Sequence, residues 1–141
     1  MGTVKCVESA GELGTAYNIR FKVFVDEQNV PVELELDEYD NDAVHMLALE
    51  GGVAVGCGRV VFFEGYAKIG RVAVLKEHRG RGHAKMICEK LIDIAREQGS
   101  RKAVLDSQCS AEGFYRKLGF EPEGEVFDDA GIEHVRMVKT L

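Results

Sequence analysis

The chain has 141 residues, a length that suggests one domain, residues 1–141, with a single hydrophobic core. Hydrophobic residues make up 45% and charged residues 30% of the chain, which is typical of a soluble globular protein. The net charge of −6 argues against broad nucleic-acid binding, and no apolar run approaches the roughly 20 residues that would span a membrane.

The cysteines and the N-terminus indicate a cytoplasmic protein. Cys6, Cys57, Cys88 and Cys109 are scattered and form no Cys-x-x-Cys pair, so they indicate reduced thiols rather than a metal site or disulfides. The chain does not open with a basic segment followed by an apolar stretch, so we expect no secretory signal.

The first expected element is a helix from about residue 10 to residue 25. Ser9 and Glu12 have the spacing of a capping box at its start. The side chains that recur at helical spacing are Leu13, Ala16, Tyr17, Arg20 and Phe24. Asn29-Val30-Pro31 then breaks the helix, and the acidic segment up to Asp42 is expected to be a loop with at most one helical turn.

Three strands are expected next, joined by two tight turns. The strands cover residues 43–50, 53–63 and 66–75, and the turns lie at Gly51-Gly52 and Glu64-Gly65. Helices and strands alternate in the second half of the chain. The expected elements there are helix 84–98 capped by Gly99, strand 102–107, helix 110–118 closed by Gly119, and strands 126–127 and 134–139 joined at 128–131. This order predicts a mixed α/β sheet with helices on both faces.

Charge is distributed unevenly along the chain. The segment from Val23 to Gly58 contains no Lys or Arg, whereas six of the ten residues from Lys76 to Lys85 are Lys, Arg or His. The acidic residues of the first segment are Asp26, Glu27, Glu33, Glu35, Asp37, Glu38, Asp40, Asp42 and Glu50. The basic loop suits an anionic cofactor, and the acidic segment either attracts a cationic amine or is only a solvated loop.

The run from Val72 to Ala84 is the strongest candidate for a binding site. An apolar strand stops at a polar turn, and Gly80 and Gly82 precede an amphipathic helix. Glycines let backbone N–H groups approach an anion, a helix N-terminus supplies free donors, and Arg79 and Arg81 add charge-assisted hydrogen bonds. This arrangement predicts a pyrophosphate site, although an ordinary strand-to-helix turn has the same composition.

Two motifs together resemble one family. The chain lacks a P-loop, and the third glycine of a dinucleotide fingerprint is missing. Arg79-Gly80-Arg81-Gly82-His83-Ala84 instead resembles the acyl-CoA-binding motif of the GNAT N-acetyltransferase superfamily, and the segment from Phe114 to Phe120 resembles its Phe-Tyr-x-x-x-Gly-Phe motif. The strings 20–28 and 131–134 resemble the small bacterial ElaA-like branch of that superfamily.

The resemblance implies a fold and a reaction. The fold is a central, mostly antiparallel sheet splayed into a V between strands 66–75 and 102–107. The reaction transfers an acetyl group from acetyl-CoA to a primary amine of a small molecule or peptide, by direct attack in a ternary complex. The implied CoA contacts are Val72, Ala73 and Val74 for the pantetheine arm, Arg79, Gly80, Arg81, Gly82, His83 and Ala84 for the pyrophosphate, and Phe114 and Tyr115.

The resemblance also implies catalytic roles. Tyr115 is the expected general acid, because a phenol stays protonated at neutral pH and can protonate the departing thiolate. Relatives often carry a Glu on the strand before the glycine loop, but Lys68 occupies that position here. The candidates for the general base are Glu27, Asp37, His45 and His134; alternatively the amine arrives neutral, or a water chain serves.

Several alternatives stay open at this stage. Cys109 could form an acyl-cysteine or be a small buried thiol, and Arg71 could bind an acceptor carboxylate or form a surface ion pair. The chain could also be a non-catalytic acyl-CoA sensor or a nucleotide-binding regulatory domain. The acidic segment favours a cationic acceptor such as a polyamine, and the C-terminal strands could pair with a second copy to form a homodimer.

Overall fold

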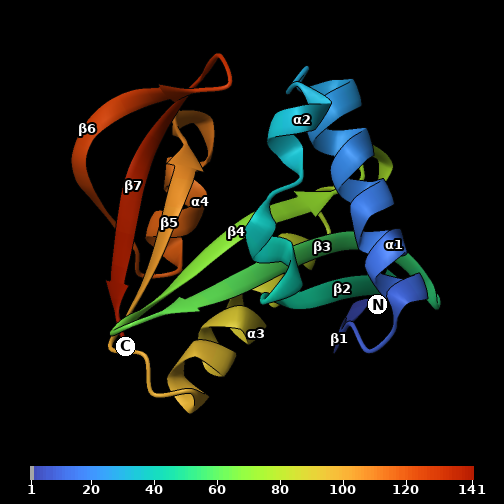
Figure 1. Cartoon of the computed structure of the whole chain (residues 1–141), viewed down its shortest axis with the longest axis horizontal. Helices are drawn as coiled ribbons and strands as arrows, with labels where there is room; N and C mark the ends of the chain where they lie inside the picture. The colour runs from blue at the N-terminus through green and yellow to red at the C-terminus, as the bar shows by residue number, and fades with distance from the viewer. Residues whose placement is uncertain (1) are drawn as a thin grey trace.

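A seven-stranded sheet organises the protein. The structure is a computed structural model that describes residues 2–141, and its strands follow the order β1-β2-β3-β4-β5-β7-β6 (Figure 1). The strands are β1 Gly2–Cys6, β2 Val44–Glu50, β3 Val53–Phe63, β4 Tyr66–Val74, β5 Lys102–Gln108, β6 Glu121–Asp129 and β7 Ile132–Thr140. All neighbours pair antiparallel except β4 and β5. The predicted mixed, mostly antiparallel α/β fold is therefore confirmed.

Helices cover both faces of this sheet. They are α1 Ala10–Arg20, the π-helical η1 Phe21–Glu27, α2 Val32–Glu35, α3 His83–Glu97 and α4 Glu112–Lys117, with 3₁₀ turns η2 Glu38–Asn41, η3 Lys76–His78 and η4 Cys109–Ala111. None of the helices within residues 2–141 is long and apolar enough to cross a membrane.

Side chains of β2 point alternately to the two faces of the sheet and contribute to two separate cores. Met46 and Ala48 face one side and belong to the large core that includes Ile87 and Leu91 of α3. Leu47 faces the other side and packs in a second cluster with Ile19 of α1. Successive strand residues point to opposite faces, so one strand can serve both layers.

The first helix consists of two consecutive segments, α1 and the π-helical η1. The Ser9 hydroxyl accepts a hydrogen bond from the Glu12 N–H at 3.1 Å, as the capping pattern predicted. After Arg20 the helix continues as η1, in which the Gln28 N–H reaches back to the Val23 carbonyl at 3.1 Å. This wider winding carries the chain to Gln28 before the expected break.

Two strands differ from the prediction. β1 was not expected, because its five residues are too few to show a periodic pattern. β6 begins at Glu121 rather than at Val126, and every one of its residues is exposed. An edge strand without a buried face lacks the apolar alternation by which a strand is identified in a sequence.

The sheet splits between β4 and β5. These parallel strands pair only from Tyr66 to Lys68, against Lys102 to Val104. Figure 1 shows them diverging from a shared end near the C-terminus, with β5, β7 and β6 forming the second arm. The V-shaped splay is confirmed, at the position that was expected.

Candidate active site

The gap between the two arms is a cleft of about 730 Å³. β4 lines one wall from Lys68 to Val74, and β5 lines the other from Leu105 to Gln108. Residues of η1, α2, η2, β3, α4 and the β6–β7 hairpin also line the cleft. The Gln108 amide donates to the Gln28 side-chain oxygen at 2.7 Å, a bond that links β5 to the end of η1.

The backbone of Val74 points into this cleft. Val74 is the register partner of Gly56, and the Leu75 N–H donates to the Val55 carbonyl at 2.8 Å. A hydrogen bond between the residues flanking a pair identifies that pair as the non-hydrogen-bonded type. The N–H of Val74 therefore points away from β3, toward the side that β5 has left open.

A β-bulge lies just before this position. Cys57 pairs with Ala73 and Arg59 pairs with Gly70, so two residues of β4 stand opposite one residue of β3. Arg71, within the bulge, has a φ of +53°, which is uncommon for a residue with a Cβ. Bulges bend a strand and redirect its side chains, and here the bulge forms part of the cleft wall.

The glycine loop presents a run of free donors. Within residues 2–141, no acceptor is found for the backbone N–H groups from Gly80 to Ala84. Gly80 and Gly82 have φ values of 78° and 83°, and a Cβ added to either would meet no atom within 4 Å. The loop is thus open to a ligand, and α3 begins directly after it. This geometry fits the pyrophosphate group expected from the sequence.

The side chain of Arg79 has a structural partner. Its guanidinium binds both carboxylate oxygens of Glu27 at 2.6 and 2.7 Å, and its Nε donates to the Val74 carbonyl at 2.9 Å. The hydrogen bond from Arg79 lowers the pKa of the Glu27 carboxyl. Arg79 therefore fixes the loop to η1 and to the end of β4.

Glu50 holds the rest of the loop from β2. Its carboxylate contacts His83 Nε2 at 2.8 Å, His78 Nδ1 at 3.2 Å and the Arg81 guanidinium. The hydrogen bond from His83 and these further contacts lower the pKa of Glu50 to about 2. The His83 ring is buried, so its side chain is not open to a ligand, and only its backbone N–H belongs to the free donors of the loop.

Tyr115 lines the cleft as expected, but Phe114 does not. Tyr115 packs edge-on against Phe114 and Phe120, with ring centroids 5.0 and 6.0 Å apart. Burial raises the pKa of the Tyr115 phenol. A raised pKa keeps the hydroxyl protonated, which a proton donor requires. Phe114 supports the position of Tyr115.

Two expected base candidates lie outside the cleft lining. Glu27 is held by Arg79, and a carboxylate with a lowered pKa is a weak base. His45 is buried, its Nε2 lies 2.9 Å from the Asp40 carbonyl, and its ring packs edge-on against Tyr17. These placements do not fit a base for Glu27 or His45, because tertiary contacts occupy both side chains.

Asp37 and His134 do line the cleft. Arg59 binds Asp37 through two hydrogen bonds of 2.7 Å and lowers the pKa of that carboxyl. His134 Nδ1 lies 2.7 Å from the Ile132 carbonyl, and its ring stacks on Phe127. A carbonyl only accepts, so Nδ1 carries the proton and Nε2 of the neutral ring keeps a lone pair.

The structure adds a carboxylate that the sequence analysis missed. Lys68 Nζ lies 3.1 Å from Asp106 Oδ2 on β5, and both residues line the cleft. The signal in the sequence is a charged residue directly after the apolar run 103–105. Cys109, in contrast, is not part of the cleft lining and packs against the large core, as a structural thiol would.

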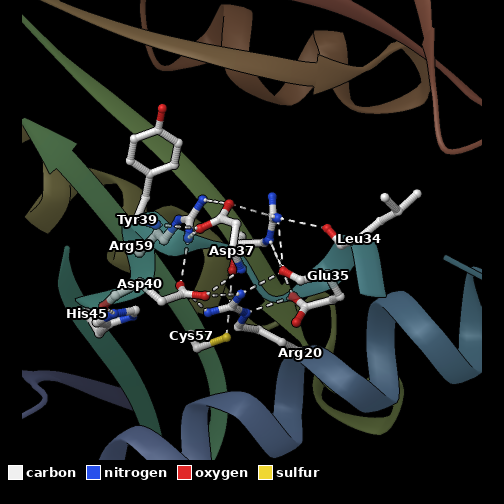
Figure 2. A network of polar contacts seen from close by, with 10 residues as sticks. Arg20, Leu34, Glu35, Asp37, Tyr39, Asp40, His45, Cys57 and Arg59 are labelled. Carbon is white, nitrogen blue, oxygen red and sulfur yellow. Dashed lines mark hydrogen bonds and ion pairs between the residues drawn. The ribbon is translucent and has the colours of Figure 1, made fainter. Parts of the chain in front are cut away.

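A buried ionic cluster lies beside the cleft (Figure 2). Arg20 is 1% exposed and bonds Glu35 and Asp40 at 2.7 Å each. Arg59 bonds Asp40 at 2.6 Å as well as Asp37. Figure 2 shows Asp40 between the two arginines. The cluster joins α1, α2 and η2 to β3, so it holds the acidic segment in place.

The charges of this cluster support one another. Burial alone would raise the pKa of Asp40, but hydrogen bonds from Arg20 and Arg59 hold it at about 2. Burial alone would lower the pKa of Arg20, but its bonds to Asp40 and Glu35 raise it. Each group is stabilised in its charged form, so removal of one partner would leave an uncompensated buried charge.

Comparison with known proteins gives a consistent result. A sequence model of the acetyltransferase (GNAT) domain matches residues 8–141. The chain is 40% identical to the uncharacterized N-acetyltransferase YjcF of Bacillus subtilis, over 91% of this chain and 92% of that protein. The crystal structure of Escherichia coli ElaA is 26% identical over 99% of each chain, with a TM-score of 0.88. A GNAT acetyltransferase of Elizabethkingia anophelis with acetyl-CoA bound shares the fold, at 17% identity, 99% and 98% coverage and a TM-score of 0.76.

We expect Arg20→Met to lower the free energy of unfolding by about 3–5 kcal/mol at pH 7, because Glu35 and Asp40 stay buried without their partner. Urea denaturation measures this loss. Asp40 has a folded pKa below its ordinary 3.8, so its contribution is present above pH 4 and is lost as the pH falls toward 2. The difference in the free energy of unfolding between the variant and the parent should therefore become smaller as the pH falls.

Arg96→Met is the matched control. Arg96 forms an exposed pair with Asp93 on α3, and its loss should change the free energy of unfolding by less than about 1 kcal/mol. Equal losses in the two variants would mean that the buried cluster does not stabilise the fold.

Proposed function

We propose that this chain, which belongs to the acetyltransferase (GNAT) family, transfers an acetyl group from acetyl-CoA to a primary amine of a small molecule or peptide. The observation that carries the proposal is the continuity of two sets of backbone donors. The free N–H groups of the glycine loop follow, along the chain, the Val74 N–H that points into the cleft. A pyrophosphate and a thioester carbonyl are the groups that such donors suit.

The fit to acetyl-CoA is supported at three places. The N–H groups from Gly80 to Ala84 are open to the pyrophosphate. The backbone from Val72 to Val74 lines the cleft where the pantetheine arm would run. The related fold that has acetyl-CoA bound supports the same cosubstrate for this chain. Arg81 is proposed to contribute to the loop through Glu50 rather than by direct contact.

The chemistry requires one bond to form and one to break. The amine nitrogen attacks the thioester carbon, the C–N bond forms, and the C–S bond breaks. The Val74 N–H would stabilise the charge that develops on the carbonyl oxygen. Tyr115 would donate its proton to the departing thiolate, because it lines the cleft and its phenol stays protonated at neutral pH.

His134 is the proposed acceptor of the amine proton. Its ring lines the cleft, and its Nε2 lone pair is free of the contact that Nδ1 makes. Among the four candidates named from the sequence, Glu27 and Asp37 are held by arginines, and His45 lies outside the cleft lining. The base assignment therefore moves to His134.

Replacement of Gly82 by Val should weaken acetyl-CoA binding by at least about tenfold. A side chain at this position enters the space that the pyrophosphate would occupy, and φ near 83° strains any residue with a Cβ. Isothermal titration calorimetry with acetyl-CoA measures the change. Gly99→Val carries the same φ strain at the far end of α3 and should bind like the parent. If Gly82→Val also bound like the parent, the loop would not be the cofactor site.

Tyr115→Phe should lower kcat by about 10²-fold and leave the Kd for acetyl-CoA nearly unchanged, because it removes only the proton donor. Release of the CoA thiol measures turnover. Tyr17→Phe removes a hydroxyl from a residue outside the cleft lining and should keep the parent rate. Equal rates in all three proteins would remove Tyr115 as the acid. Acetyl-CoA binding without turnover by the parent would instead favour the acyl-CoA sensor.

His134→Gln should lower the rate at pH 7, and the deficit should shrink as the pH rises and the amine loses its own proton in solution. A pH–rate profile of the variant and the parent measures this effect. His45→Gln serves as the matched control, because His45 is also a partnered histidine but lies away from the cleft. A larger, pH-dependent loss in His45→Gln would return the base assignment to His45.

A further inference from the structure

Arg71 lies beside the buried cluster, and its contacts with carboxylates are longer than those of Arg20 and Arg59. Its Nη2 lies 3.3 Å from Asp37 Oδ2, and its Nε lies 3.4 Å from Glu35 Oε1. Both carboxylates make shorter bonds of 2.7 Å elsewhere, Asp37 to Arg59 and Glu35 to Arg20. Arg71 therefore shares both of its carboxylates with arginines that bind them more closely.

The electrostatics of the cluster agree with this geometry. Burial and the neighbouring cations Arg59 and Arg20 lower the pKa of Arg71. The pKa values of Arg59 and Arg20 are raised by their own carboxylates. An anion brought to Arg71 would relieve the repulsion that its neighbours exert.

Part of the Arg71 guanidinium is free and accessible. The close hydrogen bonds of Arg71 run from Nε and Nη2 to the Glu35 carbonyl, at 3.1 and 2.9 Å. Nη1 has no hydrogen-bond partner in the described chain, and it is not fully buried. Because Arg71 lines the cleft, its Nη1 donors are available to a ligand there.

The backbone holds Arg71 in place at some cost. Its φ of +53° falls in a region that L-residues seldom occupy, and the β4 bulge imposes it. Arg71 precedes Val74 by three residues, so an acceptor bound at Arg71 lies on the strand that would hold the thioester. Backbone strain of this kind is common at ligand sites.

Three aromatic side chains also belong to the cleft lining. They are Tyr39, Phe63 and Tyr66, with centroids 5.7 Å apart for Tyr39 and Phe63 and 5.0 Å apart for the stacked Phe63 and Tyr66. Aromatic rings in a cleft can pack against an apolar body of a ligand.

The acidic segment no longer argues for a cationic acceptor. The carboxylates that gave it a negative charge beside the cleft, Glu35, Asp37 and Asp40, are bound by Arg20 and Arg59. The cleft lining instead includes the Arg71 guanidinium and the three aromatic rings.

We infer that the acceptor is an amine that also bears a carboxylate and an apolar body, as in an apolar amino acid. Arg71 binds the carboxylate, and Tyr39, Phe63 and Tyr66 pack against the apolar body. The inference rests on the acetyl transfer proposed above, whose amine acceptor it specifies.

Matched acceptors test this specificity on the unmodified protein. L-phenylalanine, L-phenylalaninamide and spermidine are compared by the release of CoA thiol at saturating acetyl-CoA. We expect kcat/KM to be at least tenfold higher for phenylalanine than for its amide, since a hydrogen-bonded charge pair contributes a factor of about 10 to 100. We expect spermidine to be the poorest of the three.

Variants then locate the carboxylate site. Arg71→Gln should remove the preference for the acid over the amide, mostly through KM, and Arg71→Lys should restore part of it. The amino groups of phenylalanine and its amide differ in basicity, but this difference is the same for every variant. It therefore cancels when the ratio of kcat/KM for acid and amide is compared between a variant and the parent. Arg136→Gln is the matched control, because Arg136 is an exposed arginine that also lines the cleft. Acetyl-CoA affinity and the melting temperature confirm that each variant is folded.

The outcomes separate the inference from the proposed function. Equal use of acid and amide, a preference for spermidine, or loss of the preference in Arg136→Gln alone would overturn the role of Arg71 while acetyl transfer stands. If no acceptor reacts, phenylalanine and its amide are titrated into the CoA-bound protein. Binding of the acid alone, weakened in Arg71→Gln, supports the carboxylate site, and its absence overturns it. Failure to bind acetyl-CoA would overturn the proposed function itself.

Discussion

The separation of β4 from β5 is the constraint on which the rest of the structure depends. The two strands share hydrogen bonds only between Tyr66–Lys68 and Lys102–Val104. Beyond that point β4 keeps a partner on one side only, and its outward backbone groups need other partners. The Val74 carbonyl accepts a bond from Arg79, while the Val74 N–H faces the cleft. An incomplete sheet thus leaves one edge of β4 as an open wall of the cleft.

The buried ionic cluster fixes the helical segments that lie beside the cleft. It connects α1, α2 and η2 to β3 through Arg20 and Arg59, each of which satisfies two carboxylates. A buried pair contributes little net stability compared with apolar packing, but it fixes geometry because each charge needs its partner. The cluster orders an acidic segment that would otherwise repel itself, and it leaves Arg71 facing the cleft.

Regular elements with a clear apolar pattern were predictable from the sequence. The helix that follows the glycine loop and the three strands before it appear close to their expected bounds, because each has a face that must be buried. β1 was missed because its five residues are too few to show a period, and β6 was shortened because it is an exposed edge strand. The acidic loop contains a helical turn, α2, and the 3₁₀ turn η2, both too short to show a period.

The sequence by itself determined the family and the order of the parts, because the glycine loop and the segment around Tyr115 are local strings of residues. Only the tertiary structure decided which charged side chains are bound by a partner within the protein. Arg79 and Glu27 are 52 positions apart, and Gln28 and Gln108 are 80 positions apart, yet each pair is bonded. A side chain's partner depends on which elements the fold brings together, and a linear pattern does not contain that information. For this reason the acidic segment suggested a cationic ligand, whereas in the folded chain Glu35, Asp37 and Asp40 of that segment are bound by Arg20 and Arg59.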